Sequence, residues 1–276
     1  MDLKVLYANL FSKLSDMKKY SFNVEKVTEE LIQWIRDWFE LNGKGCNAVI
    51  GISGGKDSTT VAALCCKALG ADHVIGVMMP CGDQKDISDS IMICKHLGIR
   101  NYTINIKDAV DGVLRQMEAA GVEITKLTRT NLPPRIRMST LYAVSQSNNG
   151  RVSNNCNKSE DVMGYSTRYG DSVGDFSPLS ELTTVEIVQI ADYLGVPYEL
   201  SHKTPIDGLN FNPDGSYVTD EQNMGVSYNE IHQYVRLGGL PQEKQEMIAK
   251  REKANEFKLL LMPKYTPGED LLYSRE

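Results

Sequence analysis

The sequence lacks the features that place a protein in a membrane or join it by disulfides. Its 276 residues contain no apolar run near the roughly 18 residues that a membrane-spanning helix requires. The first 20 residues mix charges into their apolar positions and lack the core of a signal peptide. The six cysteines form no C-x-x-C pair, which favours reduced, mostly structural thiols. These absences predict a cytoplasmic protein.

The chain also lacks an excess of basic residues and any spacing typical of a zinc site. It has 30 Lys and Arg against 36 Asp and Glu, a net charge of −6. This balance predicts that neither nucleic acid nor a membrane surface is a partner. The four histidines and six cysteines show no zinc-ligand pattern. With 41% hydrophobic and 24% charged residues, the composition is that of a globular protein.

Alternating apolar patterns predict the fold class. Apolar residues at three-and-four spacing predict a helix over 24–40. Further along, the patterns predict strands at 47–52, 73–79 and 101–106 and helices at 58–69, 86–97 and 108–120. This alternation is typical of parallel βαβ units. We therefore predict an α/β fold with a doubly wound, mostly parallel sheet flanked by helices, in which ligands bind beyond the carboxyl ends of the strands.

The second half of the chain is less regular. After Pro133-Pro134 the pattern predicts a helix over 135–147, followed by a short strand at 151–155. A capping box, Thr183 to Glu186, opens a helix that ends at Leu194. Two more segments are predicted, a long loop at 204–226 and a charged helix at 241–261.

The most informative segment follows the first predicted strand. It reads Gly51, Ile52, Ser53, Gly54, Gly55, Lys56, Asp57 and Ser58. Glycines at a helix start let backbone N–H groups face an anion, although a plain tight turn is the simpler alternative. The segment is not a Walker A loop, because an aspartate follows the lysine. A carboxylate beside a polyphosphate is repulsive unless a cation lies between them, so Asp57 predicts bound Mg²⁺.

The motif S-G-G-x-D-S at 53–58 resembles the PP-loop of the N-type ATP pyrophosphatases, which have an adenine nucleotide alpha-hydrolase-like fold. Other motifs narrow this resemblance. They are R-x-R-M at 135–138, N-x-S-E at 157–160, G-Y-x-T-x-Y-G-D at 164–171, F-S-P-L at 176–179 and K-T-P-x-D-G-L at 203–209. In this order they are similar to the ammonia-dependent NAD⁺ synthetases.

This resemblance implies a reaction and its partners. Such an enzyme activates the nicotinate carboxylate of deamido-NAD⁺ with ATP, forming an acyl-adenylate and pyrophosphate, and ammonia then yields NAD⁺ and AMP. It implies one α/β domain over 23–265, a helical extension at 1–22 and a tail at 266–276. It further implies a homodimer with the dinucleotide across its interface. Residues before 25 are too few for a glutaminase, so we expect free ammonia to be the nitrogen source.

The resemblance also implies residue roles. ATP is expected on the loop at 51–58 together with Asn155 and Thr184. Asp57 and Glu160 are expected to hold Mg²⁺, and Asp57 and Asp175 to act in catalysis. Four residues are expected to bind deamido-NAD⁺, namely Arg137, Arg168, Asp175 and Lys258. Near neutral pH ammonia is mostly ammonium, so the Asp175 carboxylate could bind the cation and accept its proton.

Several positions depart from the family pattern. Asn155 stands where threonine is usual, Thr184 and Arg168 where many members have lysine, Ile206 where a hydroxyl residue is usual, and Phe257 where histidine is common. Two alternatives stay open, another PP-loop adenylating ligase (tRNA-modifying or amide-forming) and a non-catalytic ATP-binding module. Pyrophosphate release that depends on deamido-NAD⁺ separates the three.

Overall fold

The computed structural model describes residues 20–84, 86–211 and 217–267. Within them a parallel sheet of four strands has the order β3-β2-β1-β4. The strands are β1 (Asn47–Gly51), β2 (Val74–Met78), β3 (Arg100–Thr103) and β4 (Gly150–Val152). Every strand pair in this sheet is parallel. Almost all of the predicted extension at 1–22 and of the tail at 266–276 lies outside the described residues.

Helices cover both faces of the sheet, because successive strand side chains point to opposite sides. On one face, Ala48 and Ile50 of β1 pack in a core with α2 (Val24–Asn42), α3 (Lys56–Leu69), α4 (Ile87–Leu97) and α8 (Thr184–Tyr193). On the other, Val49 packs with α5 (Lys107–Ala119) and α6 (Lys126–Ser147). Burying each large apolar side chain contributes about 1.5–3 kcal/mol. The doubly wound α/β prediction is confirmed.

The sheet changes its winding direction between β1 and β4. Through α3 and α4, the chain places β2 and then β3 progressively to one side of β1. It then returns through α5 and α6 to place β4 on the other side of β1. In open α/β sheets such a switch point creates a crevice beyond the carboxyl ends of the two strands.

A separate group of helices follows the sheet in the chain. Its core contains Val162 of α7 (Lys158–Met163), Met224 of α10 (Asp220–Met224), Ile231 of α11 (Tyr228–His232) and Ile248 of α12 (Gln242–Asn255). A π-helical turn, Gln233–Leu237, follows α11. Its Arg236 joins this group to α8, with Nε 2.8 Å from Oε1 of the buried Glu186.

Three predicted segments need correction. Helix α6 begins at Lys126 rather than 135 and contains both prolines, because Thr125 caps it earlier and Met138 and Leu141 hold its second half in the core. The stretch 204–226 is not one loop. It contains an antiparallel ribbon of β5 (Ile206–Phe211) and β6 (Tyr217–Thr219), and then α10, which Thr219 and Gln222 cap. The final α-helix ends at Asn255, with a 3₁₀ turn over Glu256–Lys258.

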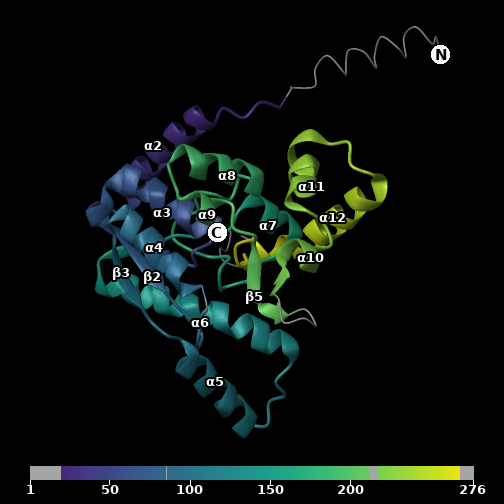
Figure 1. The fold of residues 1–276 in the computed structure, drawn as a ribbon. Coiled ribbons are helices and arrows are strands. Elements are labelled where there is room, and N and C mark those ends of the chain that lie inside the picture. The colour runs from purple at the N-terminus through teal and green to yellow at the C-terminus, as the bar shows by residue number, and fades with distance from the viewer. Residues whose placement is uncertain (1–19, 85, 212–216, 268–276) are drawn as a thin grey trace, which may run out of the picture.

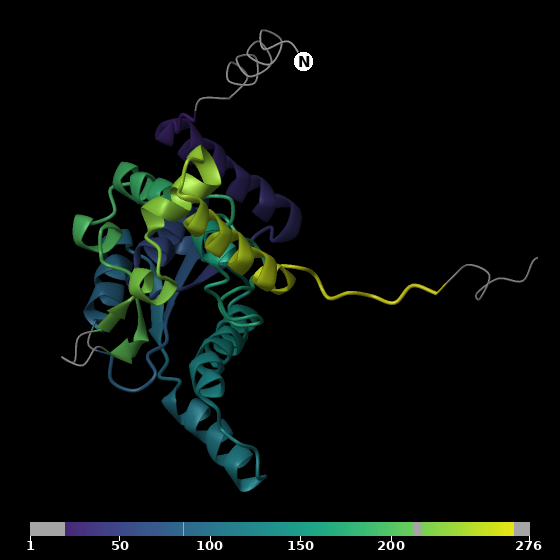
Figure 2. The ribbon, with the colours of Figure 1, turned by 90° about the vertical axis from the view of Figure 1, so that its right-hand side faces the viewer.

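One part of the structure projects from the rest. Helix α5 and the start of α6 extend away from the rest of the chain in both views (Figures 1 and 2). Among the described residues, no helix combines the length and apolar character needed to cross a bilayer. All six cysteines are free thiols, and Cys46, Cys65, Cys94 and Cys156 are buried in the structure.

Candidate active site

Two segments with polar side chains meet at the switch point. The glycine-rich loop at 51–58 follows β1, and the segment 153–160 follows β4, which pairs directly with β1. Because both strands are parallel, the two segments leave the sheet at the same edge. The structure therefore brings together residues about 100 positions apart, as the hydrogen bond from Asn157 to Asp57 illustrates.

The loop after β1 requires glycine for its shape. Gly54 has φ of +78°, and a Cβ there would lie 2.7 Å from Cβ of Asp89 and 2.9 Å from the backbone N of Ser90 in α4. Gly55 is the N-cap of α3, and the first helical residue is Lys56. The loop therefore leads into the N-terminus of a 14-residue helix, the kind of position at which backbone N–H groups can bind an anion.

Lys56 and Asp57, the first two residues of α3, form an ion pair. The Lys56 side chain is 6% exposed, its Nζ lies 3.0 Å from Oδ2 of Asp57, and it sits 4.9 Å from the Tyr228 ring centre. Burial lowers the pKa of Lys56, but the carboxylates around it, Asp57 and Glu160 above all, outweigh that effect and the pKa is raised. Lys56 is thus a positively charged group inside the site.

Glu160 is the second acid of the site and belongs to α7. Its backbone N–H donates to Oδ1 of Asn157, and its Oε2 accepts the N–H of Asn157, which completes a capping box. Burial and the neighbouring Asp57 raise its pKa well above the usual glutamate range, and Lys56 offsets only part of this. Glu160 and Asp57 are therefore neighbouring acids, and the charged form of Glu160 is disfavoured in this position.

Asn155 and Thr184 border the same place. Asn155 donates from Nδ2 to the Gly51 carbonyl at 3.0 Å and accepts from the Ser153 hydroxyl at 2.8 Å. Thr184 is the first residue of α8 and is buried, with its N–H 3.1 Å from Oγ of Ser159. Asn155 and Thr184, which both differ from the residues usual in the family, are therefore held in place by hydrogen bonds to neighbouring residues.

A second cluster gathers cations around Asp171. Arg137 of α6 donates from Nε to the Met79 carbonyl at 3.0 Å, and burial lowers its pKa. Lys258 donates from Nζ to the Gly164 carbonyl at 2.8 Å. Asp171 is exposed to solvent and accepts the N–H of Thr167 on Oδ1 at 2.7 Å. Desolvation by the surrounding protein raises its pKa, and the charges of Arg137 and Lys258 reduce that shift.

Arg168 and Asp175 lie at the margins of these clusters. The Arg168 guanidinium lies over two aromatic rings, 4.9 Å from the Tyr169 centre and 5.3 Å from that of Phe257. Asp175 accepts the Val152 N–H at 2.7 Å on Oδ2 and the Tyr142 hydroxyl at 3.3 Å on Oδ1. Burial, followed by this carboxylate, raises the pKa of Tyr142 to about 12. Asp175 is thus fastened to β4 and α6.

Sequence reasoning assigned no role to three residues of these clusters, namely Asn157, Asp171 and Tyr228. Asn157 and Asp171 are within the motifs at 157–160 and 164–171, but nothing in the local pattern shows what they contact. Tyr228 comes from α11 and reaches the site only through the packing of the later helices against α7. Its contact with Lys56 has no sequence signature.

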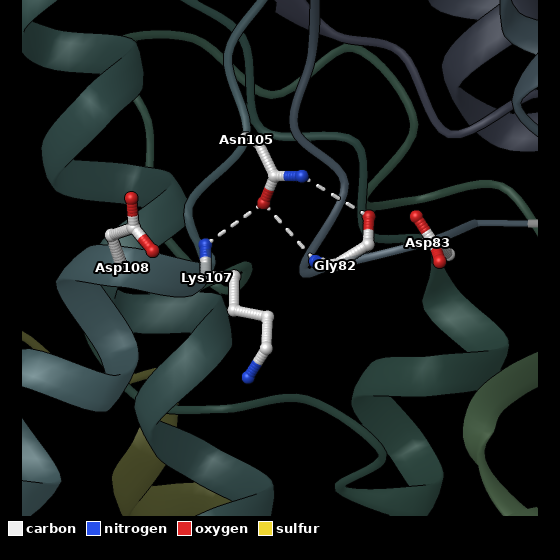
Figure 3. A pocket seen from close by; sticks show the side chains of 5 residues that line it. All are labelled: Gly82, Asp83, Asn105, Lys107 and Asp108. Atoms are coloured by element: carbon white, nitrogen blue, oxygen red, sulfur yellow. Dashed lines mark hydrogen bonds between the residues drawn. The ribbon is translucent and has the colours of Figure 1, made fainter.

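A cavity of about 440 Å³ lies farther along the same edge of the sheet (Figure 3). Its lining comes from the segments that follow β2 and β3, and includes Asp83, Lys107 and Asp108. Asn105 ties the two segments together, because its Oδ1 accepts the N–H of Gly82 at 3.1 Å and that of Lys107 at 3.0 Å. No motif in the sequence predicted this cavity.

Comparisons with known proteins agree with this geometry. The family model of NAD synthase matches residues 27–262. The chain belongs to the NAD synthase family. It is 37% identical over 229 residues to an NH₃-dependent NAD⁺ synthetase of Thermococcus sibiricus, covering 82% of this chain and 86% of that one.

Solved structures give the same family. An NMN synthetase from Francisella tularensis superimposes with a TM-score of 0.79 at 29% identity, covering 90% of this chain and 99% of that one. An NH₃-dependent NAD synthetase from Campylobacter jejuni, solved with a nitrate ion, has a TM-score of 0.71 at 29% identity, covering 89% of this chain and all of that one. Members of this synthase family are ligases, and the predicted family is confirmed.

The packing of Gly54 against α4 yields a testable expectation. Gly54→Ala forces a left-handed backbone on alanine, at a cost of about 1–3 kcal/mol, and presses its Cβ against Ser90. We expect ATP to bind about tenfold or more weaker, measured by the ATP-induced rise in melting temperature. Gly70→Ala is the control, because Gly70 ends the same helix with φ of +88° and has open space around it. Equal ATP affinity in the two variants would contradict the expectation.

Proposed function

We propose that this protein is an ammonia-dependent NAD⁺ synthetase that amidates deamido-NAD⁺, consuming ATP and releasing AMP and pyrophosphate. The observation that supports it most strongly is that the glycine-rich loop, which carries Asp57, meets the segment that carries Glu160. They meet at the switch point of the sheet in a chain of this family. That arrangement presents an anion-binding helix start and two acids to one crevice. The similarity to synthetases with this name supports the choice of reaction.

In the first step the nicotinate carboxylate attacks the α-phosphorus of ATP and pyrophosphate leaves. Negative charge builds on phosphate oxygens as this bond forms and the other breaks. The N–H groups at the start of α3 and the ammonium of Lys56 are positioned to stabilise that charge. Asn155 and Thr184 complete our proposed ATP site, since each is fixed at its border by neighbouring groups.

The residues present fit a magnesium ion. Asp57 and Glu160 offer carboxylate oxygens, the ligand type that Mg²⁺ prefers, and Asn157 contacts both acids. In the described part of the chain no cluster of three or more His, Cys, Asp or Glu could hold a metal alone. Mg²⁺ commonly takes only one or two protein carboxylates, with substrate phosphates and water as its other ligands. When bound, it would neutralise phosphate charge beside Asp57.

Removing one acid tests this assignment. We expect Asp57→Asn to keep much of its ATP binding but to lose at least 100-fold in pyrophosphate release, because the amide carries no charge for the cation. The measurement is pyrophosphate release as a function of Mg²⁺ concentration, beside nucleotide binding without metal. A wild-type rate and magnesium dependence in Asp57→Asn would refute the role.

For the acceptor, Arg137, Arg168 and Lys258 supply positive charge. Arg137 and Lys258 flank Asp171, and the rings of Tyr169 and Phe257 steady the Arg168 guanidinium. Guanidinium groups suit phosphates and carboxylates because their donors can bind two oxygens together. We propose that these three cations bind the pyridine acid and the phosphates of deamido-NAD⁺.

In the second step ammonia attacks the acyl-adenylate and AMP leaves. We propose that Asp175 attracts ammonium and takes its proton, since the solvent-exposed carboxylate is oriented by Val152 and Tyr142. Asp175→Ala is expected to slow amide formation about 100-fold while adenylation continues. Single-turnover formation of NAD⁺, compared with that of pyrophosphate, separates the steps. Amide formation at nearly the wild-type rate with saturating ammonium would remove Asp175 from the mechanism.

A smaller acceptor is a second candidate, because the NMN synthetase from Francisella tularensis superimposes over 90% of this chain. Nicotinate mononucleotide has the same reacting carboxylate as deamido-NAD⁺ but lacks the adenylate half. The family likeness counts against a tRNA-modifying ligase and a non-catalytic module, and these become outcomes of the same assay.

The deciding experiment incubates the protein with ATP, Mg²⁺, ammonium and either deamido-NAD⁺ or nicotinate mononucleotide. We expect NAD⁺, AMP and pyrophosphate to form in equal amounts with deamido-NAD⁺, and kcat/KM to be at least tenfold lower with the mononucleotide. A preference for the mononucleotide would select the second candidate. Failure of both acceptors to release pyrophosphate would refute the proposal.

The homodimer and the cytoplasmic location stay predictions. The dimer is expected to use the helices at 23–40 and 131–147, which correspond to α2 and the later part of α6. Sedimentation of the purified protein at micromolar concentration tests the predicted dimer, and a monomer at that concentration would contradict it.

A further inference from the structure

One buried amide connects the three elements around the two acids. Asn157 is fully buried and donates from Nδ2 to Oδ1 of Asp57 at 3.0 Å. Its Oδ1 accepts the N–H of Ser159 at 2.9 Å and that of Glu160 at 3.1 Å, which starts α7. The same oxygen accepts the hydroxyl of Thr184, at the start of α8, at 3.4 Å.

Asn157 holds one oxygen of each acid. Its side chain occupies Oδ1 of Asp57, and its backbone N–H occupies Oε2 of Glu160 at 3.2 Å. Lys56 approaches the other oxygen of Asp57. Asn157 is thus a residue that contacts both carboxylates, which follow different strands.

We propose that Asn157 is a positioning residue that fixes the spacing and orientation of Asp57 and Glu160 for the magnesium ion. This inference depends on the proposed function in one respect, namely that a magnesium ion binds at these two acids. Groups that orient metal ligands in this way typically affect metal affinity or activity 10–100-fold.

The side-chain chemistry explains why asparagine is needed here. Only an amide of this length both accepts the helix N–H groups and donates to a carboxylate. Serine is also a good N-cap but is too short to reach Asp57 from the same position. Alanine loses the cap as well. The two substitutions therefore separate helix capping from the contact with Asp57.

The experiment measures the affinity of the protein for Mn²⁺, a spectroscopic substitute for Mg²⁺. Binding is followed by electron paramagnetic resonance in the presence of α,β-methylene-ATP. For Asn157→Ser we expect Mn²⁺ to bind 10–100-fold more weakly than in the wild type while the metal-free melting temperature changes little. For Asn157→Ala we expect the same weakening together with a melting temperature lower than that of the serine variant by about 2–4 °C.

Asn23→Ser provides the matched control. Asn23 caps α2 through the N–H of Lys26, far along the chain from the acids, so the change should alter neither Mn²⁺ affinity nor ATP affinity. Wild-type Mn²⁺ affinity in Asn157→Ser would overturn the proposal and reduce Asn157 to a helix cap. So would a wild-type protein that binds no Mn²⁺ with the nucleotide analogue.

Failure of the proposed function gives a different result. If the wild-type protein binds Mn²⁺ and Asn157→Ser weakens it, the positioning role stands even when no acceptor is amidated. The binding measurement uses no acceptor and no turnover, so the two hypotheses are tested separately.

Discussion

Two acidic side chains, Asp57 and Glu160, which Asn157 joins at the junction of β1 and β4, impose the main constraint on this structure. Burial, and after it the neighbouring Asp57, disfavours the ionised form of Glu160. A buried lysine lies beside them, and its charge offsets only part of the repulsion. Our proposed magnesium site rests on this pair of acids beside the start of α3.

The surrounding polar contacts keep this arrangement in place. Helix α7 is short, so its capping box and the side chain of Asn157 contribute much of its order. Helix α8 starts at Thr184 against α7, and its Glu186 is bound by Arg236 and by the hydroxyl of Tyr20. The later helices thus close over the acids from one side and bring Tyr228 onto Lys56. Removing a partner from buried ionic contacts of this kind leaves an uncompensated charge.

Local patterns predicted much of the sheet and its helices, because apolar periodicity is a local property. The strand at 47–52 and the helix at 58–69 correspond to β1 and α3 with shifts of one or two residues. Predictions were wrong where context outweighed local preference. Prolines 133 and 134 suggested a helix start, yet packing of the later turns extends α6 across them. The stretch at 204–226, rich in Pro, Gly, Asn and Asp, suggested a loop, although pairing of β5 with β6 makes a ribbon.

The sequence by itself determined the glycine-rich turn at the start of α3, since glycines, a lysine and a helix start are consecutive residues whose geometry depends on near neighbours. It also indicated the family through the order of several short motifs. Only the tertiary structure decided which groups meet: Asp57 with Asn157, Arg137 and Lys258 with Asp171, and the Arg168 guanidinium with the Phe257 ring. These partners belong to elements far apart in the chain. Strand pairing and helix packing, which no local pattern encodes, set the distances between them.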